Sequence, residues 1–143
     1  MDTADGRSRL FAILEESLCR DADLEFAIVF GSHATDEVHK SSDFDLAVKF
    51  VDDLSSHERF RKRCFLSGNL QREDAPFVDV SDIDELPLTV AHEAVNGAFL
   101  CGNELAFNRF KETVETAFAK RRTDDERRHR ATIDRIAEGG LSG

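Results

Sequence analysis

The chain has 143 residues, a length that suits one domain with a buried core. Its formal net charge of −10, from 29 acidic and 19 basic residues, argues against direct nucleic-acid binding, which needs a basic face. No apolar stretch approaches the length of a membrane span and no secretory signal is seen, so we expect a cytoplasmic protein.

The first half of the chain predicts helices and strands from its apolar spacing. Leu10, Leu14 and Leu18 form one helical stripe, and Ser55 with Glu58 forms a capping box that opens a later helix. The predicted order is a disordered start over 1–7, a helix over 8–20, strands over 24–30 and 43–51, and a helix over 55–66.

The second half continues with a short strand and mostly helical segments. The predicted order is a strand over 77–80, a helix over 86–96, an apolar run over 98–101, a helix over 104–121, and a last helix from Thr123 that stops at Gly139. This order predicts an α/β (α+β) fold with a small mixed sheet, covered by helices on one side. We divide the chain into a domain over 1–120 and a charged helical tail over 121–143.

The cysteines indicate no cross-link. Cys19, Cys64 and Cys101 are odd in number and far apart, which predicts neither a disulfide framework nor a zinc pair. Each stands among apolar neighbours, so we expect three small core residues. This use of cysteine fits a reducing cytoplasm.

The most informative stretch lies between the first two predicted strands. An apolar run over 24–30 ends at Gly31-Ser32, and Asp43 and Asp45 open the next run. Within a strand, the period of two places both carboxylates on one face, where they repel unless a cation lies between them. Paired oxygen ligands suit magnesium, and a glycine–serine turn lets the backbone approach a phosphate.

Each part of this pattern also has a plainer interpretation. With 29 acids in 143 residues, an Asp-x-Asp can occur by chance as a polar turn before a strand. Gly31-Ser32 alone fits any turn at a strand end. No His and acid pair is indicated that would activate Ser32 as a nucleophile, so covalent catalysis is not expected.

Taken together, Gly31-Ser32, ten intervening residues and Asp43-x-Asp45 resemble the nucleotidyltransferases related to DNA polymerase β, in particular their minimal nucleotidyltransferase (MNT) branch. The resemblance covers residues from about 8 to 110. It implies two Mg²⁺ ions, ATP as substrate and a third acid on a neighbouring strand, a place that Asp79 matches. The implied metal ligands and catalytic residues are Asp43, Asp45 and Asp79, with Gly31 and Ser32 at the nucleotide.

The chain also departs from the family pattern. Where that turn often has a basic third residue and a glycine at the sixth place, this chain has His33 and Asp36. That difference weakens the case for triphosphate binding. The basic residues over 59–63 either compensate by reaching the nucleotide or form a charged outer helix face.

MNT proteins of this size resemble antitoxins of the MntA type, which are encoded with HEPN-domain RNase toxins. The resemblance implies that the chain adenylylates a tyrosine of its HEPN toxin and thereby neutralises it. The chain has no tyrosine, so it cannot modify itself at that residue. Two alternatives stay open: an antitoxin that acts by binding alone, and a small-molecule nucleotidyltransferase, for whose extra helical domain there is little room. The sequence leaves the oligomeric state open.

Overall fold

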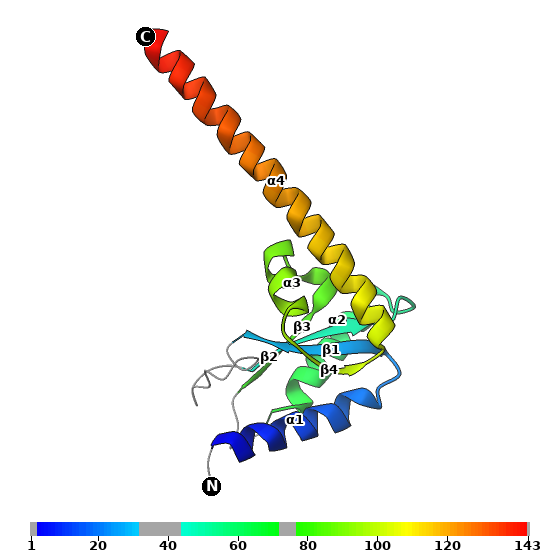
Figure 1. Cartoon of the computed structure of the whole chain (residues 1–143). Coiled ribbons are helices and arrows are strands. Elements are labelled where there is room, and N and C mark those ends of the chain that lie inside the picture. Colours follow the sequence, from blue (N-terminus) through cyan, green and yellow to red (C-terminus); the bar gives the residue numbers. More distant parts are fainter. Residues whose placement is uncertain (1–2, 32–43, 72–76, 143) are drawn as a thin grey trace.

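The computed structural model of the chain describes residues 3–31, 44–71 and 77–142 (Figure 1). In chain order its elements are α1 (Thr3–Cys19), β1 (Leu24–Phe30), β2 (Phe44–Phe50), α2 (Ser56–Asn69), β3 (Val78–Asp82), the short 3-10 helix η2 (Ile83–Glu85), α3 (Leu88–Val95), β4 (Ala98–Gly102) and α4 (Glu104–Ser142).

Most predicted elements appear with small changes in their bounds. Strand β1 has the predicted bounds, and β2 lies within its predicted range. The capping box at the start of α2 is confirmed, because the Ser55 hydroxyl accepts the Glu58 N–H and the Glu58 carboxylate accepts the Ser55 N–H. Helix α1 begins at Thr3, so the disordered start predicted over 1–7 is wrong for residues 3–7.

The four strands form one mixed sheet with the order β3-β2-β1-β4. Strand β1 is antiparallel to β2 and β4, whereas β2 and β3 are parallel. Parallel neighbours need a crossover connection, and α2 provides it between β2 and β3. The predicted α+β class with a small mixed sheet is confirmed.

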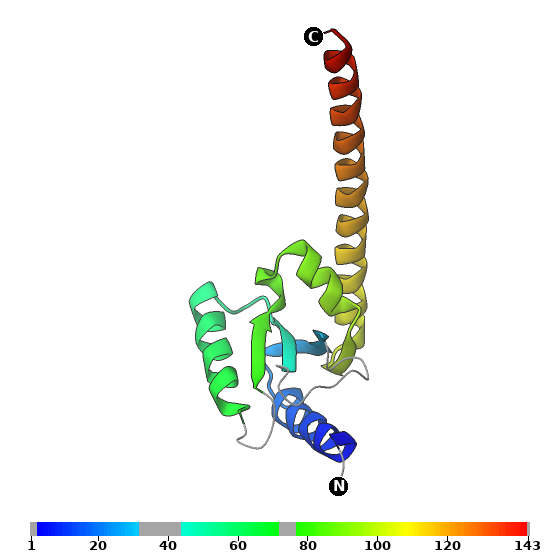
Figure 2. The same ribbon diagram turned by 90° about the vertical axis from the view of Figure 1, so that its left-hand side faces the viewer.

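Helices cover both faces of this sheet, which corrects the expectation of one covered side (Figure 2). The reason lies in the strands, whose side chains alternate between two apolar cores. On β1, Ala27 and Val29 join the core beneath α1 and α2, whereas Phe26, Ile28 and Phe30 join the core beneath α3 and α4. A strand that is apolar on both faces needs a helical layer on each.

Helix α4 is one continuous helix of 39 residues. The helix start predicted at Thr123 is wrong, because the Thr123 hydroxyl donates to the Ala119 carbonyl, 3.0 Å away, as inside a helix. The predicted stop at Gly139 is wrong as well. The ion pair between Arg122 and Glu126, four residues apart, spans the start predicted at Thr123 and supports a continuous helix there.

The second half of α4 extends away from the rest of the molecule (Figure 1). Its last aromatic anchor is Phe118, whose ring stacks on His92 of α3 with centroids 3.8 Å apart. Beyond this stack the side chains through residue 136 are mostly exposed. The division at residue 120 stays a prediction, since the helix crosses it without a break. Within the described ranges, no helix combines the length and apolar character needed to cross a membrane.

A disulfide bond joins Cys19, at the end of α1, to Cys101 in β4. The prediction of no disulfide is therefore wrong. The two residues are 82 positions apart in the sequence, but the fold brings their Cα atoms within 5.8 Å. Cys64 is a free thiol and exposed, which also corrects the expectation that it lies in the core. Because the chain contains a disulfide, its cysteines do not indicate a reducing compartment.

Reducing the disulfide is expected to lower the free energy of unfolding by up to about 4 kcal/mol, because the bond closes a long loop in the unfolded chain. Thermal unfolding with and without a reductant measures this, and we expect a Tm lower by on the order of 10 °C. The Cys64→Ser variant should respond to the reductant as the wild type does. A Tm that neither reductant nor Cys101→Ser changes would contradict the cross-link.

Candidate active site

Two of the three predicted carboxylates lie side by side on neighbouring strands. Asp45 on β2 is the register partner of Asp79 on β3. Paired strands lie about 4.8 Å apart, and paired residues point to the same face of the sheet. The preceding pair, Phe44 and Val78, is fully buried in the core on the opposite face. The alternation of the two strands therefore brings Asp45 and Asp79 together.

The two carboxylates differ in their exposure because of where their strands lie. Strand β2 is inside the sheet, and Asp45 is half-buried. Strand β3 is the edge of the sheet, and Asp79 is exposed. The pair thus has an inner, half-buried member and an outer, exposed member.

The other two predicted site residues, Asp43 and Ser32, lie outside the described residues, so their roles stay predictions. No group of three His, Cys, Asp or Glu side chains in the described ranges is placed to hold a metal ion. Asp45 and Asp79 still fit part of such a site, because two adjacent carboxylates offer the oxygen ligands that magnesium prefers. Asp43 would supply a third ligand.

Gly31 lies directly against the Asp45 carboxylate. It follows Phe30, which is the register partner of Asp45 between β1 and β2. Its φ of +78° is a conformation that favours glycine, and a Cβ atom there would overlap Oδ2 of Asp45. The glycine that the sequence assigns to the nucleotide site is therefore also what leaves room for one of the carboxylates.

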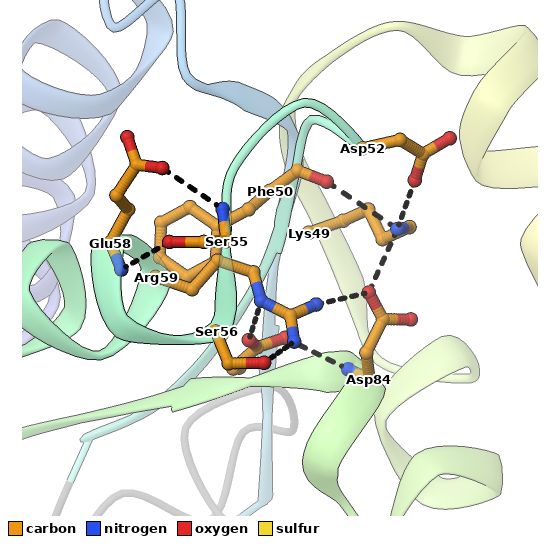
Figure 3. A network of polar contacts seen from close by, with 9 residues as sticks. Lys49, Phe50, Asp52, Ser55, Ser56, Glu58, Arg59 and Asp84 are labelled. Carbon is orange, nitrogen blue, oxygen red and sulfur yellow. Dashed lines mark hydrogen bonds and ion pairs between the residues drawn. The ribbon is translucent and has the colours of Figure 1, made fainter.

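A polar network holds the other end of the β2–β3 pair (Figure 3). Lys49 of β2 donates to the Asp84 carboxylate, 2.8 Å away. Arg59 of α2 lies with its Nε atom 3.6 Å from Oδ2 of Asp82, and its guanidinium also approaches Asp84 at 3.9 Å. Asp82 in turn accepts the Asp84 N–H at 3.0 Å and so caps the start of η2.

The network contains a buried carboxylate. The Asp82 side chain is only 2% exposed, and burial raises its pKa above the ordinary value, although the Asp84 N–H and the Arg59 charge oppose this. Burial alone would lower the pKa of Lys49, but its hydrogen bond to Asp84 and nearby carboxylate charges outweigh that effect and raise it. The opposite charges thus hold β2, α2 and β3 together.

Part of the basic segment over 59–63 makes contacts within the fold. Arg59 is paired with Asp82, and Lys62 makes ion pairs of 2.8 and 3.3 Å with Asp21 and Asp23. Both side chains therefore brace the fold. Arg63 stacks over the ring of Phe60 at 5.4 Å, on the outer side of α2. Sequence spacing gave no signal for these long-range partners.

A family model described as polymerase beta, nucleotidyltransferase, matches residues 13–104. The chain belongs to this nucleotidyltransferase family. No curated protein matches it significantly.

Solved toxin–antitoxin complexes contain chains with the same fold as this family member. The crystal structure of a toxin–antitoxin with AMP-PNP matches with a TM-score of 0.61 and 20% identity, over 91% of this chain and 97% of that one. The structure of the tri-AMPylated Shewanella oneidensis HEPN toxin in complex with MNT antitoxin matches with a TM-score of 0.61 and 18% identity, over 91% of this chain and 98% of that one. The crystal structure of the toxin–antitoxin MntA-HepT matches with a TM-score of 0.55 and 18% identity, over 94% of this chain and 98% of that one.

Two glycines give a matched test of the close contact between position 31 and Asp45. Gly31→Ala is expected to lower the free energy of unfolding by about 1–3 kcal/mol, because it strains the backbone and displaces the Asp45 carboxylate. Gly68→Ala, inside α2 with open space around it, should instead raise that free energy by roughly 0.5–1 kcal/mol. Urea unfolding measures both. Equal effects of the two substitutions would contradict the contact with Asp45.

The buried carboxylate predicts a pH dependence of stability. Because the pKa of Asp82 is raised above 3.8, the folded protein holds this proton more tightly than the unfolded chain. The contribution of Asp82 to stability should therefore fall as pH rises from 3.8 through the raised pKa, by at most about 1.4 kcal/mol per pH unit.

Urea unfolding across the acidic range should show this slope as a difference between the wild type and Asp82→Asn. Asp53→Asn, at an exposed residue, serves as the control and should keep the wild-type slope. If wild type and Asp82→Asn differ by the same amount at every pH, the buried carboxylate does not titrate as argued.

Proposed function

We propose that this chain is an antitoxin that transfers AMP from ATP to a tyrosine hydroxyl of a cognate HEPN toxin. The observation that carries the proposal is the register of Asp45 with Asp79 beside Gly31, in a chain of the nucleotidyltransferase family. Support for the partner comes from complexes of the same fold, one with AMP-PNP and one with a tri-AMPylated HEPN toxin.

The proposed reaction is a nucleotidyl transfer at the α-phosphorus of ATP. The acceptor oxygen forms a bond to the α-phosphorus of ATP, the bond from that phosphorus to the bridging oxygen breaks, and pyrophosphate leaves. The hydroxyl proton is lost to solvent or to a neighbouring carboxylate. Nothing in this step requires a covalent enzyme intermediate, so the protein has to position two substrates and balance charge.

The residues have distinct places in this scheme. Asp45 and Asp79, with Asp43, would hold magnesium ions, which when bound neutralise the triphosphate and lower the pKa of the attacking hydroxyl. Gly31 leaves room for the Asp45 carboxylate and would lie at the nucleotide end of the site. Asp79, exposed on the edge strand, lies on the side from which a protein acceptor can approach.

The test uses ATP labelled at the α-phosphate and a purified HEPN toxin expressed with this chain. We expect the wild type to label the toxin, and Asp45→Asn or Asp79→Asn to lower the rate on the order of 100-fold or more. Asp53→Asn makes the same chemical change at an exposed site outside the carboxylate pair and should retain full activity.

Growth rescue separates catalysis from binding. If the Asp79→Asn variant neutralises the toxin in cells as well as the wild type does, the chain acts by binding alone and the proposed transfer is wrong. Mass spectrometry of the toxin identifies the acceptor, and a tyrosine carrying AMP is the expected result.

A further inference from the structure

Strand β3 is short, and it lies at the edge of the sheet with only β2 beside it. Its inward side bonds to β2, as the Phe44 N–H shows by donating to the Phe77 carbonyl at 2.7 Å. The N–H and C=O of Val78 therefore point outward, where no described strand can pair with them. Val78 is fully buried, and buried backbone groups need hydrogen-bond partners.

The side chain of Gln71 provides these partners. Its Oε1 accepts the Val78 N–H at 2.9 Å, and its Nε2 donates to the Val78 carbonyl at 2.8 Å. The carboxamide thus bonds to Val78 as the backbone of a further strand would. An amide suits this task because it combines a donor and an acceptor in one plane.

The same side chain is tied to the end of α2. Nε2 of Gln71 also donates to the Ser67 carbonyl at 2.5 Å, which is one of the carbonyls that a helix end leaves without an internal partner. The helix ends at Asn69, and its C-cap residue Leu70 donates its N–H to the Leu66 carbonyl at 3.0 Å. Gln71 therefore joins the end of the crossover helix to the first residue of β3.

We propose that Gln71 is a positioning residue for Asp79, and this inference rests on the proposed function. Asp79 directly follows Val78 and is exposed, so its own side chain is not held by packing. Its place beside Asp45 depends on the register in which β3 starts. The network of Lys49, Arg59, Asp82 and Asp84 holds the other end of β3, and Gln71 holds the end next to the carboxylates.

The decisive variant is Gln71→Met, which keeps the length of the side chain and removes its hydrogen bonds. Mn²⁺, titrated into the protein and followed by electron paramagnetic resonance, probes the carboxylate pair without any acceptor or nucleotide. We expect the affinity for Mn²⁺ to fall about tenfold, the scale seen when a group that orients a metal ligand is lost. Hydrogen exchange at the Val78 amide should become faster.

Asn96→Leu is the matched control. Asn96 also uses a side-chain amide to reach a carbonyl near a helix end, that of His92 at 2.8 Å, but at α3. This variant should bind Mn²⁺ as the wild type does. If Gln71→Met does not fold, Gln71→Glu keeps the acceptor for the Val78 N–H and should still bind Mn²⁺ several-fold more weakly.

Each outcome separates the inference from the function. Wild-type Mn²⁺ affinity in the folded Gln71 variant would overturn the positioning role, even where the wild type labels its toxin. A wild type that labels no toxin but binds Mn²⁺ in a Gln71-dependent manner would overturn the proposed function alone. A wild type that binds no Mn²⁺ and labels no toxin would overturn both.

Discussion

The site depends on the parallel pairing of β2 and β3, because this register alone places Asp45 next to Asp79. A shift by one residue would turn one of the two carboxylates toward the opposite core. The apolar residues prevent that shift: Phe44 and Val78 are fully buried beneath α1 and α2. Burial of the preceding pair, Phe44 and Val78, therefore fixes the position of Asp45 beside Asp79.

Burial acts together with polar contacts at both ends of β3. Gln71 bonds to the outward backbone groups of Val78, and Arg59 lies beside the buried Asp82. Both side chains come from α2 or the residues that follow it, so the crossover helix carries the contacts that fix the strand it leads to. Such fixation matters most for an edge strand, which has a partner on one side only.

The sequence could predict the parts of this structure that depend on local pattern. The bounds of β1 and the capping box at Ser55 follow from strand period and helix-start chemistry. Asp79 is expected beside Asp45 from the family resemblance, and the register of β2 with β3 pairs the two residues. The disulfide between Cys19 and Cys101 could not be predicted, since it depends on how β4, the opposite edge strand, packs beside α1. The partners of Arg59 and Gln71 are likewise set by tertiary packing. In α4, an ion pair across Thr123 accompanies a continuous helix where the sequence predicted a new start.

The different depths of the two carboxylates bear on which acceptor the site can serve. Asp45 is half-buried on an interior strand and leaves no room for a side chain at position 31, which suits contact with a compact nucleotide. Asp79 is exposed on the edge strand, where the bulk of a protein substrate meets no further strand of the described sheet. A small-molecule enzyme needs a second wall to enclose its acceptor, whereas a folded partner brings its own surface. Under the proposed function, the exposed outer member of the pair therefore favours a macromolecular acceptor.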